Sequence, residues 1–130
     1  MKLGIVGTGN IAYRHFEEFS KIDGVKIEAV CDINSENLNL FTKKFGNHLR
    51  QYSTIDEMLK EEKSFDGVCN NTPDRFHKEI SLKILEKGIN IFSEKPLAEN
   101  YEDAKILTDL AHTQNVINMV NFTYRESSGY

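Results

Sequence analysis

The chain has 130 residues, of which 39% are hydrophobic, 28% are charged and two are proline. This composition is that of an ordinary globular chain, and the length suits a single domain built around one sheet. The formal net charge of -4 offers no positive field to nucleic acid or to an anionic membrane surface, so neither partner is expected.

Short apolar runs alternate with amphipathic segments along the chain. The expected strands are residues 2–6, 25–31, 65–70, 89–92 and 116–122, with a shorter strand near Gln51 and Tyr52. Between them, apolar residues recur at helical spacing, as in Ala12, Phe16 and Phe19. The alternation predicts an α/β fold with a doubly wound, mostly parallel sheet and helices on both faces.

Three local patterns predict where helices begin and end. Thr54 and Glu57 have the spacing of a capping box, and Asn100 can cap a helix that begins at Tyr101. Gly88 follows a helical segment that ends near Lys87.

Neither cysteine suggests a metal or redox site. Cys31 and Cys69 each lie inside an apolar run that predicts a buried strand, and they do not have CxxC spacing. Reduced core thiols are therefore expected. The apolar run from Leu3 to Val6 is far shorter than the core of a signal peptide or a membrane span, which favours a cytoplasmic location.

A glycine-rich turn lies between the first strand and the first helix. Its residues are Gly7, Thr8, Gly9, Asn10, Ile11 and Ala12. Gly7 permits a tight turn, Gly9 lets a pyrophosphate approach the backbone, and the helix N-terminus offers free amides to phosphates. The pattern predicts dinucleotide binding, although glycines at a strand end often only turn the chain.

Asp32 ends the second strand about twenty residues beyond the glycine-rich turn, where dinucleotide-binding folds place an acid for the ribose hydroxyls. A solvated aspartate at a strand end is the alternative. Residues 33–41 contain no Lys or Arg that could balance a 2′-phosphate, and Asp32 would repel one. NAD is therefore favoured over NADP.

A second polar segment follows the strand at residues 65–70. Asn71, Thr72 and Pro73 come directly after it, at the edge of the sheet where open α/β folds bind ligands, so they are expected to contact the cofactor. His77 either faces the same cleft or makes a local hydrogen bond in the first turn of a helix. Both interpretations are open at this point.

Glu94 and Lys95 follow the strand at residues 89–92 and precede Pro96. An ammonium beside a nicotinamide ring can hold a substrate oxygen and pass its proton during hydride transfer, which makes Lys95 the candidate catalytic residue. The alternative is a loop lysine that pairs with Glu94.

The four segments together resemble the Gfo/Idh/MocA oxidoreductases, the family of glucose-fructose oxidoreductase and inositol dehydrogenase. The matching elements are residues 7–12, Asp32, Thr72-Pro73 with His77, and residues 94–98. Their order and spacing are similar to the family's along essentially the whole chain. The resemblance implies a Rossmann fold, bound NAD, and a dehydrogenase that transfers hydride to or from a sugar or polyol.

The resemblance also implies roles for individual residues. In that family the lysine of the Glu-Lys-Pro element touches both nicotinamide and substrate, which gives Lys95 a catalytic and substrate-binding role, and Glu94 would help to place the cofactor. Tyr124 and Arg125 would reach toward the substrate. Asn71 stands where members often have a small apolar residue, which departs from the family pattern.

Family members continue into a second α/β domain that supplies most substrate contacts and usually the oligomer interface. Residues 1–130 are therefore expected to be the dinucleotide-binding domain alone, with little activity by itself, and the full-length protein is expected to be a homo-oligomer. The alternative is a stand-alone regulatory module that senses nucleotides without catalysis. In such a module the Glu94-Lys95-Pro96 element has no evident purpose.

Overall fold

The computed structural model describes residues 1–122, and in this part of the chain six strands form a parallel sheet. The strands are β1 (Lys2–Val6), β2 (Lys26–Cys31), β3 (Arg50–Tyr52), β4 (Gly67–Asn70), β5 (Asn90–Glu94) and β6 (Asn118–Asn121). Their order is β3-β2-β1-β4-β5-β6, and every neighbouring pair is parallel. The six predicted strands are confirmed, with small differences at their ends.

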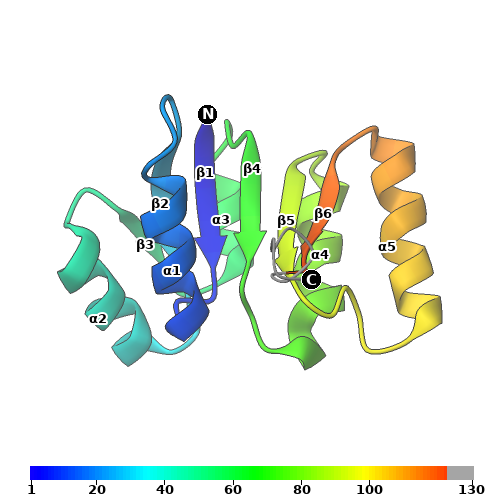
Figure 1. Ribbon diagram of the computed structural model, residues 1–130, viewed down its shortest axis with the longest axis horizontal. Helices are drawn as coiled ribbons and strands as arrows, with labels where there is room; N and C mark the ends of the chain where they lie inside the picture. Colours follow the sequence, from blue (N-terminus) through cyan, green and yellow to red (C-terminus); the bar gives the residue numbers. More distant parts are fainter. Residues whose placement is uncertain (123–130) are drawn as a thin grey trace, which may run out of the picture.

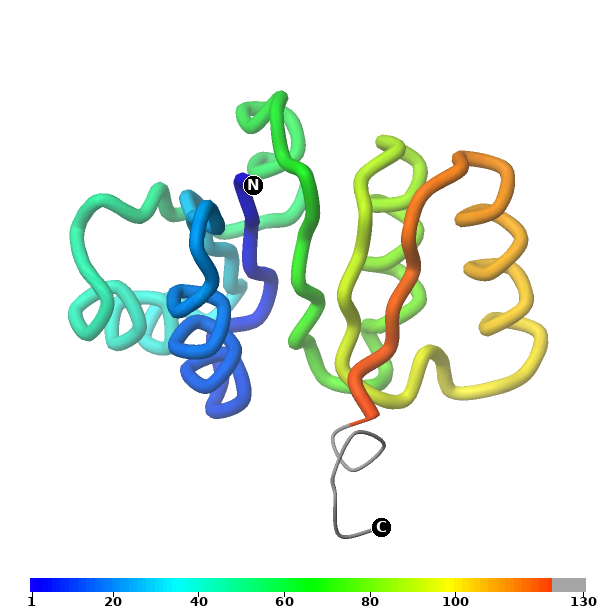
Figure 2. Tube along the Cα trace, turned by 45° about the horizontal axis from the view of Figure 1, so that its top comes forward, coloured from blue at the N-terminus to red at the C-terminus, as the bar shows by residue number. Residues whose placement is uncertain are grey.

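Helices cover both faces of this sheet. They are α1 (Asn10–Phe19), α2 (Ser35–Phe45), α3 (Ile55–Glu61), α4 (His77–Glu86) and α5 (Tyr101–Gln114), with a 3₁₀ turn, η1 (Asp74–Phe76), before α4. In Figure 1, α1 and α2 lie in front of the sheet, and α3 and α4 lie behind it. Figure 2 shows β5 and β6 side by side with α4 behind them. The doubly wound Rossmann arrangement is confirmed.

The core has two parts, one on each face of the sheet, because neighbouring residues of a strand point to opposite faces. Ile5 packs with Phe16 and Phe41 under α1 and α2. Val6, the next residue, packs on the other face with the α3 and α4 side chains Met58 and Ile84. Fully burying a side chain of this size stabilises the fold by about 1.5–3 kcal/mol, so the two faces hold the strand ends in place.

The helix ends predicted at Thr54, Asn100 and Gly88 are confirmed, whereas α1 and α4 begin without a side-chain cap. Asn34, Thr54 and Asn100 cap α2, α3 and α5, each accepting a hydrogen bond from an amide three residues later. Gly88 follows α4 with a φ of +66°. Helix α1 begins after Gly9, which provides no side-chain cap. The first amides of α1 are therefore left for another acceptor.

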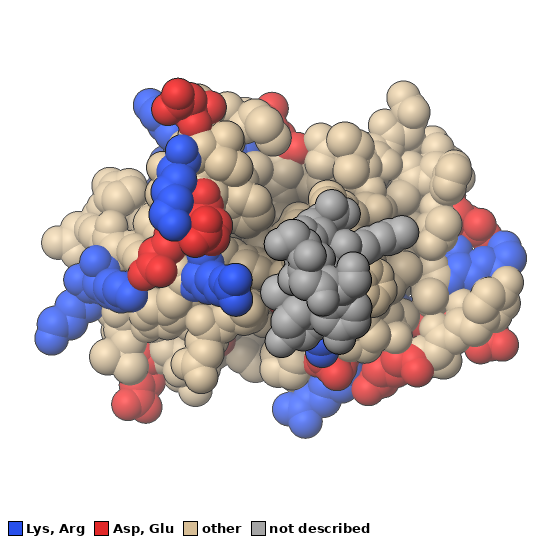
Figure 3. Space-filling view, in the orientation of Figure 1, with Lys and Arg blue, Asp and Glu red and all other residues tan. Residues whose placement is uncertain are grey.

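No helix within residues 1–122 is long and apolar enough to cross a membrane. On the face shown in Figure 3, basic and acidic side chains are intermixed over α1 and α2 rather than gathered into a field of one sign.

Candidate functional site

A cavity of about 660 Å³ opens where β1 and β4 end and α1 and η1 begin. The strand order reverses between β1 and β4, which is the place where open α/β sheets bind their ligands. Eight residues predicted to bind the cofactor line the cavity: Gly7, Gly9, Asn10, Ile11, Asp32, Asn71, Thr72 and Pro73. The structure thus gathers into one hollow residues that the sequence spreads over three separate segments.

The two glycines of the glycine-rich turn differ in their backbone conformation and surroundings. Gly7 has a φ of +84°, and a Cβ there would lie 2.8 Å from the backbone of Asn71, so a side chain is excluded. Gly9 has an ordinary φ of -72°, and a Cβ there would meet nothing within 4 Å. Gly9 is also one of the residues that line the cavity. Together with the uncapped amides of α1, the turn fits an anionic cofactor group.

Asp32 binds the glycine-rich turn. Its Oδ2 accepts hydrogen bonds from the amide and the hydroxyl of Thr8, at 2.7 and 2.8 Å, and its Oδ1 accepts one from the amide of Asn34 at 2.8 Å. Thr8 is buried and is not among the residues that line the cavity. The expected cofactor contact of Thr8 is therefore replaced by a structural one, in which it orients the Asp32 carboxylate.

Asn70 organises the loop after β4, and the sequence analysis missed it. Its Nδ2 donates to Ser81 Oγ on α4 at 3.1 Å, and its Oδ1 accepts from the amide and hydroxyl of Thr72 at 3.2 and 2.7 Å. Asn71 lines the cavity at 8% exposure, and its Oδ1 accepts a hydrogen bond from Cys69 Sγ at 3.1 Å. Its Nδ2 is buried and has no hydrogen-bond partner within residues 1–122.

The structure corrects the cofactor-facing role considered for His77. Its side chain is fully buried, and it does not line the cavity. Its Nε2 lies 2.7 Å from the carbonyl oxygen of Thr72, and its Nδ1 lies against the carbonyl oxygen of Pro96. The alternative of a local hydrogen bond is met only in part, since Thr72 is five positions away along the chain but Pro96 is 19. His77 links the loop after β4 to the loop after β5. Its role is therefore to hold these two loops together and not to contact the cofactor.

Glu94 and Lys95 diverge at the end of β5. The Glu94 carboxylate points toward α1, where it lies 2.8 Å from His15 Nε2 and accepts a hydrogen bond from Asn121 at 2.8 Å. Lys95 is exposed, precedes a cis peptide bond to Pro96, and lies outside the lining of the cavity. Among the described residues, the Glu94 carboxylate contacts His15 and forms no ion pair with Lys95. Neither side chain lines the cavity, so their expected contacts with the cofactor stay predictions.

Two further candidates, Tyr124 and Arg125, lie outside the described residues.

His15 is a second residue that the sequence analysis missed as a polar partner. It is 7% exposed on α1, and burial lowers the pKa of its imidazole below the ordinary value, an effect that the Glu94 carboxylate partly offsets. Two further polar neighbours, Cys69 and Asn121, are 54 and 106 positions away along the chain. Because these partners are far away in sequence, no local spacing could have indicated the contact.

The far end of the cavity is formed by residues that were not proposed from the sequence. Thr54 and Ile55 at the start of α3 line it, as do Arg75, Phe76 and Lys83 from η1 and α4. Arg75 lies over the Phe76 ring at 4.7 Å, and Lys83 pairs with Asp56 at 2.7 Å. The start of α3 follows the carboxyl end of β3. Because open α/β sheets bind ligands at this edge, that position could have indicated that Thr54 and Ile55 line the cavity.

Both cysteines are free and buried, which confirms the expectation of reduced core thiols. Burial raises the pKa of Cys31 to about 12, with a smaller contribution from Asp32, and burial also raises the pKa of Cys69. Both thiols stay protonated at neutral pH and are poor nucleophiles.

Comparison with known proteins is consistent with this geometry. The model of a family described as "Oxidoreductase family, NAD-binding Rossmann fold" matches residues 1–122. Glucose-6-phosphate 3-dehydrogenase of Bacillus subtilis is 34% identical over 124 residues, which are 95% of this chain and 34% of that protein. The inositol 2-dehydrogenase/D-chiro-inositol 3-dehydrogenase of Shouchella clausii is 29% identical over 136 residues, covering 100% of this chain and 38% of that protein.

A solved structure shows the same fold. The WlbA dehydrogenase of Chromobacterium violaceum, in complex with NADH and UDP-GlcNAcA, superposes with a TM-score of 0.89 at 27% identity and covers 97% of this chain and 36% of that one. The chain therefore spans about a third of the length of the relatives it matches.

Proposed function

Because this chain belongs to the Gfo/Idh/MocA family of oxidoreductases, we propose that its cavity binds NAD(H) as the cofactor site of a dehydrogenase. The observation that carries the proposal is the open wall of the cavity at Gly9. There a side chain would enter empty space, and the first amides of α1 have no side-chain cap. Backbone amides that are free at a helix N-terminus are suited to a pyrophosphate.

NAD is the favoured form of the cofactor. Asp32 lines the cavity, and its Oδ1 accepts one hydrogen bond, from Asn34, which leaves capacity for a ribose hydroxyl. The same carboxylate would repel a 2′-phosphate, and residues 33–41 contain no basic side chain to offset that repulsion. The basic residues that line the cavity, Arg75 and Lys83, come from η1 and α4 instead.

The proposed reaction is hydride transfer between the cofactor and a secondary alcohol or ketone of a sugar or polyol. Bound nicotinamide would supply the hydride acceptor or donor. Lys95, at the end of β5, would hold the substrate oxygen and exchange its proton, with Tyr124 and Arg125 as further substrate contacts. Support for this substrate class comes from the glucose-6-phosphate and inositol dehydrogenases among the relatives.

This chain covers about a third of the length of the relatives that it matches. We therefore propose that these residues are the dinucleotide-binding domain of a longer cytoplasmic enzyme, in which a second domain supplies most substrate contacts and the interface of a homo-oligomer. The chain alone should bind the cofactor and turn over substrate very slowly.

Calorimetric titration of the 130-residue chain with NADH and NADPH tests the proposal. We expect saturable binding of NADH at one site and weaker binding of NADPH. A chain that is folded by circular dichroism and binds neither nucleotide would refute the proposed function.

A further inference from the structure

His15 and Glu94 form a buried polar pair on the α1 side of the sheet. His15 Nε2 lies 2.8 Å from Glu94 Oε1, and the two side chains are 8% and 15% exposed. The first residues of α1 line the cavity, and Glu94 is the last residue of β5, directly before Lys95. The pair thus joins the helix proposed to receive the pyrophosphate to the strand that ends directly before the candidate catalytic lysine.

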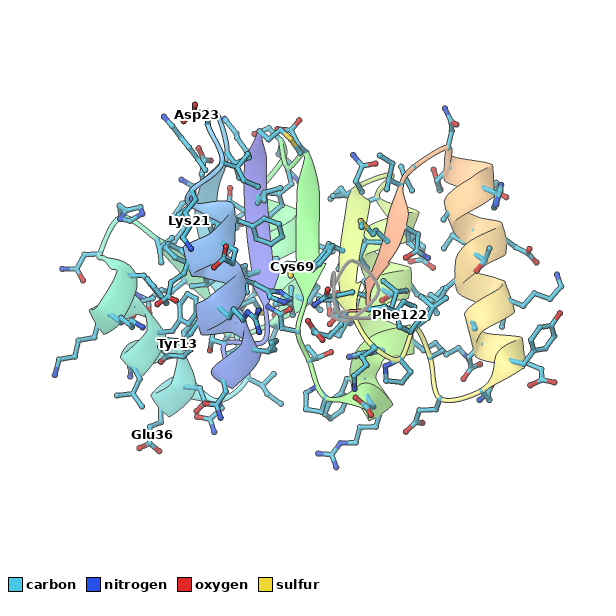
Figure 4. All side chains as sticks on the ribbon, in the orientation of Figure 1. Tyr13, Lys21, Asp23, Glu36, Cys69 and Phe122 are labelled. Carbon is cyan, nitrogen blue, oxygen red and sulfur yellow. The ribbon has the colours of Figure 1, made fainter. Side chains whose placement is uncertain are left out.

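The pair is held on several sides. Asn121 on β6 donates a second hydrogen bond to Glu94 Oε1 at 2.8 Å, and His15 Nδ1 lies 3.2 Å from Cys69 Sγ on β4. Figure 4 labels Cys69 at the centre of the sheet, beside α1. The imidazole ring also packs edge-on against two aromatic side chains, those of Phe19 and Phe92. The pair therefore contacts residues of α1, β4, β5 and β6. A change of rotamer at His15 or Glu94 would lose some of these contacts.

The titratable and charged groups that face His15 are Glu94 from β5, Cys69 from β4 and Arg14 from its own helix. Burial lowers the pKa of His15, and Arg14 adds to that effect, while Glu94 opposes it. The imidazole is therefore neutral at neutral pH, and its Nε2–H donates to the Glu94 carboxylate. Burial keeps the Cys69 thiol protonated by raising its pKa, so no second negative charge competes for the imidazole.

We propose that His15 is a positioning residue for Lys95. By holding the Glu94 carboxylate toward α1, His15 prevents it from pairing with the ammonium of the next residue in the chain. The ammonium of Lys95 then remains exposed and is not paired with the Glu94 carboxylate. At the carboxyl edge of the sheet, such an ammonium can contact a substrate oxygen. This inference rests on the proposed function, because the exposed lysine has a purpose only in a dehydrogenase.

The test is competitive acetylation of the 130-residue chain with trace acetic anhydride. Mass spectrometry gives the rate at Lys95 relative to the other lysines. In His15→Leu, the released carboxylate should pair with Lys95 and lower its relative rate about two- to fivefold, the scale of a partly exposed ion pair. In His15→Gln, whose amide can still donate to Glu94, the rate should stay near that of the parent.

The double variant His15→Leu/Glu94→Gln separates this mechanism from a general disturbance. Without the carboxylate, Lys95 should react at the parent rate again. Phe92→Leu, which alters the packing of the His15 ring without removing the pair, should leave Lys95 unaffected. An unchanged rate in folded His15→Leu, or equal slowing in the double variant or in Phe92→Leu, would overturn the proposal.

A second measurement does not require replacement of His15. Nuclear magnetic resonance of the ¹⁵N-labelled imidazole should show His15 titrating at lower pH in Glu94→Gln than in the parent, since the carboxylate favours the protonated ring. An unchanged titration would show that the pair is not formed. These readouts do not depend on bound nucleotide, so a failure of NADH binding by the parent chain would count against the proposed function alone.

Discussion

The carboxylate of Asp32 accepts two hydrogen bonds from Thr8, one from the backbone amide at 2.7 Å and one from the hydroxyl at 2.8 Å. Thr8 lies in the turn after β1, and Asp32 follows β2, so these bonds join two connections that are separated by 24 positions in the chain. The residue proposed to bind the ribose is thereby oriented by the turn proposed to bind the pyrophosphate. The two proposed contact points for the cofactor are therefore held together by hydrogen bonds within the protein.

Asp32→Asn should lower NADH affinity about tenfold or more, because hydrogen bonds to a charged group are worth about 1.5–3 kcal/mol. The preference for NADH over NADPH should narrow, because the repulsion of the 2′-phosphate is removed. Calorimetry with both nucleotides measures these effects. Thr8→Val, which removes the hydroxyl and keeps the charge, should cause a smaller loss. NADPH binding to the parent as tightly as NADH would contradict the assignment of Asp32.

Gly9→Val should abolish measurable NADH binding and leave the fold intact. The backbone at Gly9 has an ordinary φ, and a Cβ there would meet no protein atom within 4 Å, so neither backbone strain nor a clash of the Cβ is expected in the free chain. The added methyl groups would instead occupy the cavity. Circular dichroism and calorimetry together check both halves of the prediction, and Gly9→Ala should give an intermediate loss. Undiminished affinity in folded Gly9→Val would place the cofactor elsewhere.

Lys95→Met in the complete enzyme should lower turnover by about a hundredfold or more, the usual contribution of a general acid-base group. NADH binding should change by no more than a few-fold, because Lys95 lies outside the lining of the dinucleotide cavity. Steady-state kinetics and calorimetry on the same preparation separate the two effects. Lys105→Met serves as a control, since Lys105 pairs with Asp109 on the surface of α5. Full turnover in Lys95→Met would leave this lysine without a catalytic role.

Acidification should destabilise the chain partly through His15. The folded-state pKa of His15 is lowered from the ordinary value of 6.5, chiefly by burial, so the unfolded chain binds the proton more readily. The neutral imidazole of His15 contributes fully to the free energy of unfolding above pH 6.5. This contribution is lost as the pH falls through the lower pKa that His15 has in the folded state. Urea unfolding at pH 7.5 and 5.5 should therefore show a smaller loss of stability in His15→Gln than in the parent.

His112→Gln is the matched control for this pH dependence, because His112 is exposed on α5. It should lose stability on acidification as the parent does. Equal pH dependence in the parent and in His15→Gln would show that the buried imidazole does not take up a proton in this range.

The fold followed from local patterns in the sequence. Strands such as Lys2–Val6 are short apolar runs, and the caps at Thr54 and Asn100 are set by residues three positions apart, so a single pass along the chain is sufficient to find them. The glycine-rich turn and Asp32 were also predictable. Each lies at the carboxyl end of a strand, and parallel strands bring such ends to one edge of the sheet.

The tertiary structure alone decided which polar groups meet. His15 and Glu94 come from segments 79 positions apart, and Asn70, His77 and Pro96 meet only because β4, α4 and the loop after β5 pack together. A buried histidine can donate to a neighbour, accept from one or bind a ligand, and its sequence position does not distinguish these roles. The choice depends on the groups that packing brings within about 3 Å, and local sequence spacing carries no information about contacts at that range.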